Sequence, residues 1–253
     1  MRQTKITRPT TTFVVVGAGA KLGGEISREL YQEKQRVFLI STKEPAWLLP
    51  IDQSKILIKV ENYFALPSVL SDLIKNHFDL TIVYLLSTGG NSNLVGAVEQ
   101  VIGPVVTAMA LQGHSRVRSI LISSGLANLV GFEKGLVYHL EKSALETAFR
   151  FYAVRDTRPT RLYNIIRLSH IKSRLTKHKY QPIADGGQGL KNLPRKALDV
   201  TDLSTLVETI RFLSRSDLLN GAIIDLDQGA RFVSSVSEVS GYKDATERDW
   251  FFK

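Results

Sequence analysis

The chain has 253 residues, of which 43% are hydrophobic and 23% charged, and it has no cysteine. This composition is that of an ordinary globular protein, and the lack of cysteine excludes disulfides, thiol catalysis and cysteine-ligated metals. We predict no metal-binding residues. The net charge of +9 favours an anionic partner such as a phosphorylated cofactor or an acidic carrier protein. Nucleic acid is a weaker alternative, because the sequence has no zinc finger, aromatic RNA-binding signature or run of basic residues.

The first eleven residues are expected to form a flexible N-terminus. The apolar run Phe13–Ala20 is short, rich in β-branched residues and followed at once by a glycine turn, so it predicts a strand and not a secretory signal. No segment reaches the roughly 18 apolar residues of a membrane span. We therefore expect a cytoplasmic protein without membrane contact.

The first predicted unit is a strand, a glycine turn and a helix. The β-branched run Thr12–Val16 predicts a buried strand, Gly17–Gly24 forms the turn, and the helix covers Glu25–Glu33. Glycines let the backbone approach a phosphate, and a helix N-terminus supplies free N–H groups. The spacing is G-x-G-x-x-x-G, which departs from the dinucleotide fingerprint G-x-G-x-x-G. A purely structural glycine turn is the alternative.

A second strand is predicted over Arg36–Ile40, and the residues that follow it bear on the choice of cofactor. An NAD-binding protein usually has an acid at this position for the ribose hydroxyls. Here the sequence has Ser41, Thr42 and Lys43, which suit a 2′-phosphate better, and Lys21 would reach the same phosphate. The expected cofactor is NADP(H), the alternative being that both lysines are simply solvated.

The rest of the chain alternates between strands and helices. Further strands are predicted over Lys55–Val60, Asp79–Leu86, Val117–Ile122, Leu162–Leu168 and Gly221–Leu226, and helices over Leu66–His77, Leu94–Leu111, Tyr138–Val154 and Asp199–Leu213. The pair Gly103-Pro104 should kink the second of these helices. Such alternation predicts a parallel sheet covered on both faces. The expected fold is one α/β domain over residues 1–253, a Rossmann-like doubly wound sheet of about seven strands.

In such a sheet, ligands bind beyond the carboxyl ends of the strands. Gly17, Ser41, Ser87 and Ser124 all lie at those ends, and Glu61 directly follows the third strand. We expect these residues to lie at one edge of the sheet, around a cofactor.

The helix that begins at Tyr138 brings a phenol and an amine together. Tyr138 and Lys142 are four residues apart, so they lie on one helix face. An ammonium beside a phenol favours the phenolate and lowers its pKa, and such a phenol can exchange a proton with a carbonyl or an alcohol near neutral pH. The pair alone also occurs by chance on solvated helices. Its place after the glycine turn and after Ser123-Ser124 favours a chemical role.

These motifs resemble those of the short-chain dehydrogenases/reductases, from Phe13 to about Gly229. Tyr138 to Lys142 corresponds to the family's Y-x-x-x-K, and Ser143–Glu146 after it is also typical. The turn keeps the first and last family glycines, with Lys21 in place of the middle one, as in NADPH-dependent members. The resemblance implies a carbonyl/alcohol oxidoreductase whose cofactor contacts come from Gly17, Gly19, Ala20, Lys21, Leu22, Gly23, Ser41, Thr42, Lys43, Glu61, Ser87, Tyr138 and Lys142.

The same resemblance assigns the catalytic roles. Tyr138 is the general acid in reduction, and Lys142 lowers its pKa and holds the nicotinamide ribose. Ser124, with Ser123 as the fallback, donates a hydrogen bond to the substrate oxygen. The relay asparagine corresponds to Gln100, and the N-N-A-G after the fourth strand is absent. These departures motivate a second hypothesis of another class, a cofactor-binding sensor or interaction protein without efficient catalysis.

One segment has a charge of its own. The segment from Lys172 to Lys196 contains seven basic residues and only one acidic residue, Asp185, and its glycines are expected to make it flexible. We expect residues 172–198 to form a lid that recruits an anionic or carrier-bound substrate, the alternative being a solvated loop. The resemblance also implies a homodimer or homotetramer formed through the two long helices, Leu94–Leu111 and Tyr138–Val154.

Overall fold

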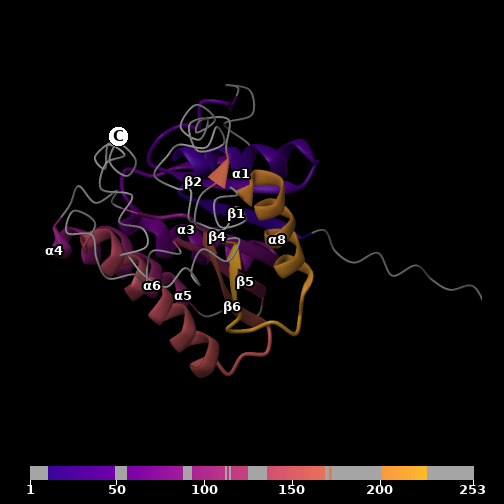
Figure 1. Cartoon of the computed structure of the whole chain (residues 1–253). Helices are drawn as coiled ribbons and strands as arrows, with labels where there is room; N and C mark the ends of the chain where they lie inside the picture. The colour runs from indigo at the N-terminus through magenta and orange to yellow at the C-terminus, as the bar shows by residue number, and fades with distance from the viewer. Residues whose placement is uncertain are drawn as a thin grey trace, which may run out of the picture.

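The computed structural model describes residues 11–48, 56–87, 93–111, 113, 115–124, 136–168, 171–172 and 201–226. In these ranges strands and helices alternate along the chain, and Figure 1 shows a central sheet with helices on both sides. The predicted lid over 172–198 lies outside the described residues except for the backbone of Lys172. The predicted flexible N-terminus lies outside them up to residue 10.

Seven parallel strands form the sheet, which confirms the predicted doubly wound fold. They are β1 (Thr12–Val16), β2 (Arg36–Ser41), β3 (Leu57–Lys59), β4 (Asp79–Tyr84), β5 (Arg116–Ser124), β6 (Arg161–Leu168) and β9 (Ile223–Leu226). Their order is β3-β2-β1-β4-β5-β6-β9, so it reverses between β1 and β4. In sheets of this kind that reversal marks the crevice where ligands bind. A separate two-stranded ladder pairs β7 (Ile171–Lys172) with β8 (Thr201–Asp202).

The helices cover the two faces of the sheet unequally. They are α1 (Lys21–Gln32), the short 3-10 helix η1 (Tyr63–Ala65), α3 (Leu66–Asn76), α4 (Leu94–Ala97), the π-helical η2 (Val98–Ile102), α5 (Gly103–Met109), α6 (Leu136–Arg155) and α8 (Leu203–Arg215). The helices α3, α5 and α6 pack on one face, and α1 and α8 on the other (Figure 1). None of the helices in the described ranges is long and apolar enough to cross a membrane.

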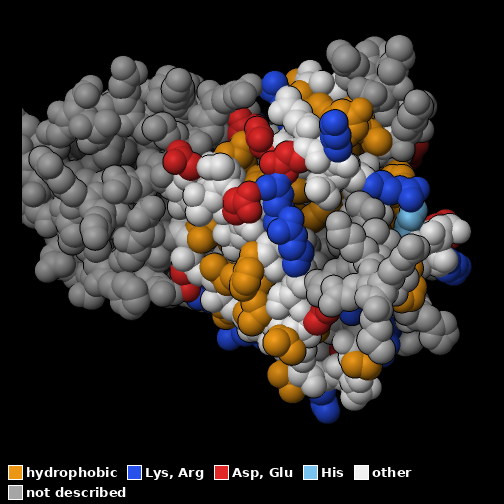
Figure 2. Space-filling model, turned by 90° about the vertical axis from the view of Figure 1, so that its right-hand side faces the viewer, with side chains coloured by type: hydrophobic (Ala, Val, Ile, Leu, Met, Phe, Trp, Pro, Cys, Tyr) orange, Lys and Arg blue, Asp and Glu red, His pale blue; other side chains and the backbone are white. Residues whose placement is uncertain are grey.

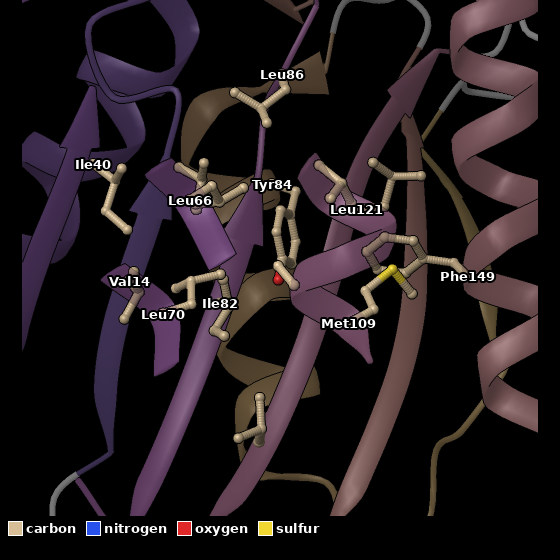
Figure 3. Close-up of a cluster of buried hydrophobic side chains, with 14 of the residues drawn as sticks. Val14, Ile40, Leu66, Leu70, Ile82, Tyr84, Leu86, Met109, Leu121 and Phe149 are labelled. Carbon is tan, nitrogen blue, oxygen red and sulfur yellow. The ribbon is translucent and has the colours of Figure 1, made fainter. Parts of the chain in front are cut away.

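The face under α3, α5 and α6 has an aromatic centre (Figure 3). Tyr84 on β4 meets Phe149 on α6 edge to face, with ring centroids 5.7 Å apart. Aliphatic side chains such as Val14, Leu70 and Leu121 surround this pair and are fully buried. Burying side chains of this size contributes about 1.5–3 kcal/mol each, so this packing fixes α6, and with it Tyr138 and Lys142, against the sheet.

Several predicted helices differ from the observed ones. The helix predicted over Asp199–Leu213 begins only at Leu203, because Thr201 and Asp202 form the strand β8. Helix α1 begins at Lys21 and not at Glu25, because Gly23 and Gly24 are buried in its first turn. A Cβ on Gly23 would lie only 2.3 Å from the carbonyl oxygen of Gly17. The long helix over 94–109 continues through Gly103-Pro104, and the π-helical η2 precedes that pair. Since Pro104 has no N–H to donate, a local change of helical pitch is the expected accommodation.

The amino edge of the sheet is held by a buried ion network. The Arg118 side chain is 2% exposed and donates to Asp79 at 2.6 Å and to Asp217 at 2.7 Å.

On the face that carries α8, acidic and basic side chains lie next to one another between scattered hydrophobic ones (Figure 2). Arg211 there pairs with Glu33 of α1 and with Glu208.

Candidate functional site

The glycine turn is fixed at the point where the strand order reverses. Gly17 has a φ of +90°, which favours glycine, and a Cβ there would lie 2.9 Å from the carbonyl oxygen of Leu85. Its N–H donates to Ile40 at the end of β2, and Leu85 after β4 donates to Val16. The turn is therefore held between the carboxyl ends of β2 and β4.

The start of α1 suits an anion. Its N-cap residue, Ala20, is exposed and offers no side-chain cap, and the first turn contains no acidic residue. Lys21 is exposed at the first helical position. Uncapped N–H groups, the helix dipole and a nearby ammonium all attract negative charge. The helix start therefore has the features expected of a phosphate-binding turn, although α1 begins at Lys21.

The segment after β2 lies directly against the glycine turn. A Cβ on Gly19 would lie 2.3 Å from Ser41 Oγ and 2.5 Å from the Lys43 carbonyl oxygen. Ser41 is 1% exposed, and its hydroxyl accepts a hydrogen bond from the Lys43 N–H at 3.1 Å. Lys43 itself is exposed and Thr42 half-buried. Of these three residues, the Lys43 side chain is therefore the one most available to a ligand.

The remaining predicted cofactor residues lie at the same carboxyl edge. Glu61 follows β3 and Ser87 follows β4, and both are exposed, whereas Leu22 in α1 is half-buried. Sequence reasoning missed Tyr63, which lies beside this edge and is hydrogen-bonded to Thr42. No sequence pattern pointed to Tyr63, which lies in the short helix η1 before α3.

The hydroxyls of Ser124 and Tyr138 lie next to each other at the carboxyl edge of the sheet. Ser124 is the last residue of β5, Tyr138 lies at the start of α6, and their hydroxyls are hydrogen-bonded. The pKa of Tyr138 lies above its ordinary value, mainly because the side chain is buried. The hydrogen bond with Ser124 acts in the opposite direction, and the charge of Glu141 adds a smaller increase. The prediction that this pKa is lowered is therefore wrong for this structure, because burial outweighs the hydrogen bond.

The position of Lys142 explains why its ammonium does not lower the pKa of the Tyr138 phenol. Its side chain is 4% exposed, and Nζ donates to the carbonyl oxygens of Leu86 at 2.8 Å and Ile122 at 3.5 Å. Nζ lies 5.6 Å from the centre of the Tyr138 ring, over its face. Burial lowers the pKa of Lys142 to about 8, against the opposing charges of Glu141 and Glu146. The ammonium is thus aimed at the ends of β4 and β5.

Gln100 does not join this group. It lies in η2 and is exposed, and no described contact links it to Ser124, Tyr138 or Lys142. The π-helical pitch before Pro104 sets which residues of this helix face the sheet, and Ala97 and Val101 are the buried ones. Sequence spacing from Gly103-Pro104 could not anticipate that change of pitch.

Sequence reasoning missed the charges around Lys142. Glu141 is 0% exposed and Glu146 1% exposed, both on α6. Glu146 forms a bidentate ion pair with Arg167 of β6, with N–O distances of 2.6 and 3.0 Å, and Arg167 lies 3.8 Å from Asp225 of β9. The spacing of Lys142 and Glu146, four residues on one helix, was the available signal.

Comparison with known proteins agrees with this geometry at the level of the fold. No family model and no curated protein sequence matches the chain. Among solved structures it is similar to ElxO with NADP bound (15% identity over 87% of this chain and 98% of that one, TM-score 0.63). It is also similar to Cj0485 dehydrogenase (17%, 87% and 94%, TM-score 0.67) and to a short chain dehydrogenase family protein from Francisella tularensis (15%, 87% and 98%, TM-score 0.63). The chain therefore has the fold of the short-chain dehydrogenases/reductases.

Proposed function

We propose that this protein is an NADP(H)-dependent oxidoreductase that interconverts a carbonyl and an alcohol. One observation carries the proposal: the hydrogen-bonded Ser124 and Tyr138 lie with the buried Lys142 at the carboxyl edge of the sheet. The glycine turn and the start of α1 lie at the same edge. A proton donor and a phosphate cradle at one edge are what a nicotinamide-dependent reductase requires.

The residues around the glycine turn fit the pyrophosphate and 2′-phosphate of NADP(H). The uncapped N–H groups of α1 would hold the pyrophosphate, and Lys21 and Lys43, both exposed, would approach the 2′-phosphate. Glu44, the nearest acid after β2, is paired with Lys59 at 3.3 Å. The bound cofactor would supply the hydride. ElxO with NADP bound is a structure of this fold with that cofactor, which supports the assignment.

The protonation states of the three residues favour the reductive direction. Because the pKa of Tyr138 is raised, its phenol stays protonated near neutral pH and can give a proton to a carbonyl oxygen. Ser124 would donate to the same oxygen as negative charge develops there. Lys142, with a pKa of about 8, is mostly an ammonium at neutral pH and would hold the nicotinamide ribose.

Substitution of Tyr138 tests the mechanism. Tyr138→Phe should fold and bind NADPH but lose at least about 100-fold in kcat against a panel of carbonyl compounds, since general acid catalysis contributes about that much. Tyr152→Phe is the matched control, because Tyr152 lies on the same helix and donates only to the Val106 carbonyl, at 3.4 Å. Wild-type turnover in Tyr138→Phe would reject the assignment.

A fluorescence titration tests the cofactor. NADPH should bind more tightly than NADH, and Lys43→Ala should weaken NADPH binding while leaving NADH binding unchanged. Equal affinities for the two cofactors would reject the proposed roles of Lys21 and Lys43.

Two observations favour the second candidate, an NADPH-binding sensor without efficient turnover. Gln100 is exposed in η2, and the Lys142 ammonium is directed at Leu86 and Ile122 instead of the Tyr138 hydroxyl. NADPH binding without turnover across a broad panel of carbonyl compounds and alcohols would favour this candidate over the enzyme.

We also propose that the protein is a homo-oligomer. The two long helical segments expose hydrophobic side chains, namely Leu94, Val95, Val98, Leu140, Phe151 and Val154. Val154, at 83% exposed, is the largest such exposure on α6. Val154→Asp should shift the sedimentation coefficient towards the monomer; an unchanged value would place the contact elsewhere.

We also propose that the substrate is anionic. Neutralising Lys177, Lys179 and Lys191 together should then lower kcat/KM for an anionic substrate.

A further inference from the structure

A row of polar side chains crosses the carboxyl end of the sheet beneath α6. Ser123 of β5 pairs in register with Arg167 of β6, which pairs with Asp225 of β9. Residues paired in register on adjacent parallel strands lie side by side on one face. Glu146 of α6 reaches this row and binds Arg167 through both carboxylate oxygens. The row thus connects the edge strand of the sheet with the helix that carries Lys142.

Lys142 is one helical turn from Glu146, so the two side chains are neighbours on α6. An ammonium that is 4% exposed is strongly disfavoured unless opposite charges lie nearby. Two carbonyl oxygens, from Leu86 and Ile122, supply dipoles but no full charge. The carboxylates that act on Lys142 are Glu141, with the larger effect, and Glu146.

We propose that Glu146 is a positioning residue, held in place by Arg167 and Asp225, whose carboxylate acts together with the stronger charge of Glu141 to keep the buried Lys142 in its ammonium form. This inference rests on the proposed role of Lys142 in holding the cofactor. Burial still lowers the pKa of Lys142 to about 8, and without these acids it would fall further.

Other titratable groups lie near Lys142 or Glu146. On α6 they are Tyr138 and Glu141, whose charge acts on Lys142 more strongly than that of Glu146. On the strands beneath Glu146 they are Arg167 and Asp225. From η2, which packs on α6, Glu99 is exposed to solvent. Loss of Glu146 removes a negative charge one helical turn from Lys142, while its half-buried partner Arg167 keeps its positive charge. The expected change is therefore in one direction, a lower pKa of Lys142.

The first experiment measures NADPH affinity by fluorescence between pH 6.5 and 9.5. The wild-type affinity should weaken as pH rises through about 8, where the ammonium is lost. In Glu146→Gln this midpoint should move down by about one pH unit, which at pH 8 corresponds to roughly five-fold weaker binding. Glu146→Asp should have a midpoint close to that of the wild type, because aspartate keeps the negative charge. Glu208→Gln is the matched control, since it also breaks a carboxylate–arginine pair, but on the exposed surface of α8.

The second experiment needs no cofactor and so separates this inference from the proposed function. Because the folded pKa of Lys142 lies below its ordinary 10.5, the unfolded chain binds the extra proton, and stability should rise with pH from about 8. In urea unfolding, that rise should begin at lower pH in Glu146→Gln than in wild type or Glu208→Gln. If no NADPH binds at any pH, the proposed function fails while this measurement still decides the role of Glu146.

Two results would overturn the inference. The first is a Glu146→Gln protein with the same pH midpoint of NADPH binding, and the same pH dependence of stability in urea, as Glu208→Gln. The other applies if Glu146→Gln does not fold: Asp225→Asn, at the sheet edge, should then lower the midpoint by a smaller amount. An unchanged midpoint in that variant would show that the row does not act on Lys142.

Discussion

Replacement of Lys142 by methionine should change stability in a way that reverses with pH. The folded pKa of Lys142 is about 8 against an ordinary value of 10.5. A difference of about 2.5 pH units costs the folded state about 3 kcal/mol when the amine is protonated, at about 1.4 kcal/mol per unit. Below pH 8 the wild type carries this cost in full, and above pH 10.5 it carries none.

Methionine removes the cost but also two hydrogen bonds. The bonds from Nζ to Leu86 and Ile122 contribute roughly 1 kcal/mol each. Lys142→Met should therefore be about 1 kcal/mol more stable than wild type at pH 7. At pH 10, where the wild type has regained most of its stability, the variant should be about 1–2 kcal/mol less stable.

Urea unfolding of both proteins at pH 7, 8, 9 and 10 measures this difference. Lys75→Met serves as the control, because Lys75 is exposed on α3 and its substitution should give a difference that does not vary with pH. Lys142→Met should also bind NADPH weakly at every pH. A variant that is less stable than wild type by the same amount at all four pH values would refute the reasoning about the buried ammonium.

Three further predictions follow from the geometry. Gly23→Ala should lower the free energy of unfolding by about 2 kcal/mol or more and weaken NADPH binding, because its Cβ would lie 2.3 Å from the Gly17 oxygen; an unchanged melting temperature would contradict this. Asp79→Ala should cost about 3–5 kcal/mol in urea unfolding by leaving the buried Arg118 without its 2.6 Å partner, and Arg118→Met should cost less. Carbonyl reduction should fall above about pH 8 as Lys142 loses its proton, whereas alcohol oxidation, which needs the Tyr138 phenolate, should increase relative to reduction as pH rises; parallel profiles for the two directions would count against the roles of both residues.

The fold was predictable because its signals are local. The β-branched run of Thr12–Val16, the glycines after it and the alternation that follows indicate a parallel sheet without knowledge of any contact. The Ser124–Tyr138 contact was predictable for a similar reason. A residue at the carboxyl end of a strand and one at the start of the helix that follows lie at the same edge of the sheet.

Helix boundaries and side-chain directions were less predictable, because they depend on packing between elements. The start of α1 at Lys21 follows from the contact of Gly23 with Gly17, and the exposure of Gln100 follows from the π-helical turn before Pro104. Ser41 looked like a phosphate ligand from its position after β2. Its burial against Gly19 depends on how two loops meet in space.

The sequence by itself therefore determined the doubly wound sheet, the glycine turn at its carboxyl edge and the identity of the serine, tyrosine and lysine beside it. Only the tertiary structure decided their ionisation. Burial between α6 and the sheet raises the pKa of Tyr138 and lowers that of Lys142. The opposing charge on Lys142 comes from α6, where Arg167 and Asp225 on two other strands hold Glu146 in place. Electrostatic energies depend on distance and on exclusion of water, and neither can be read from spacing along one chain.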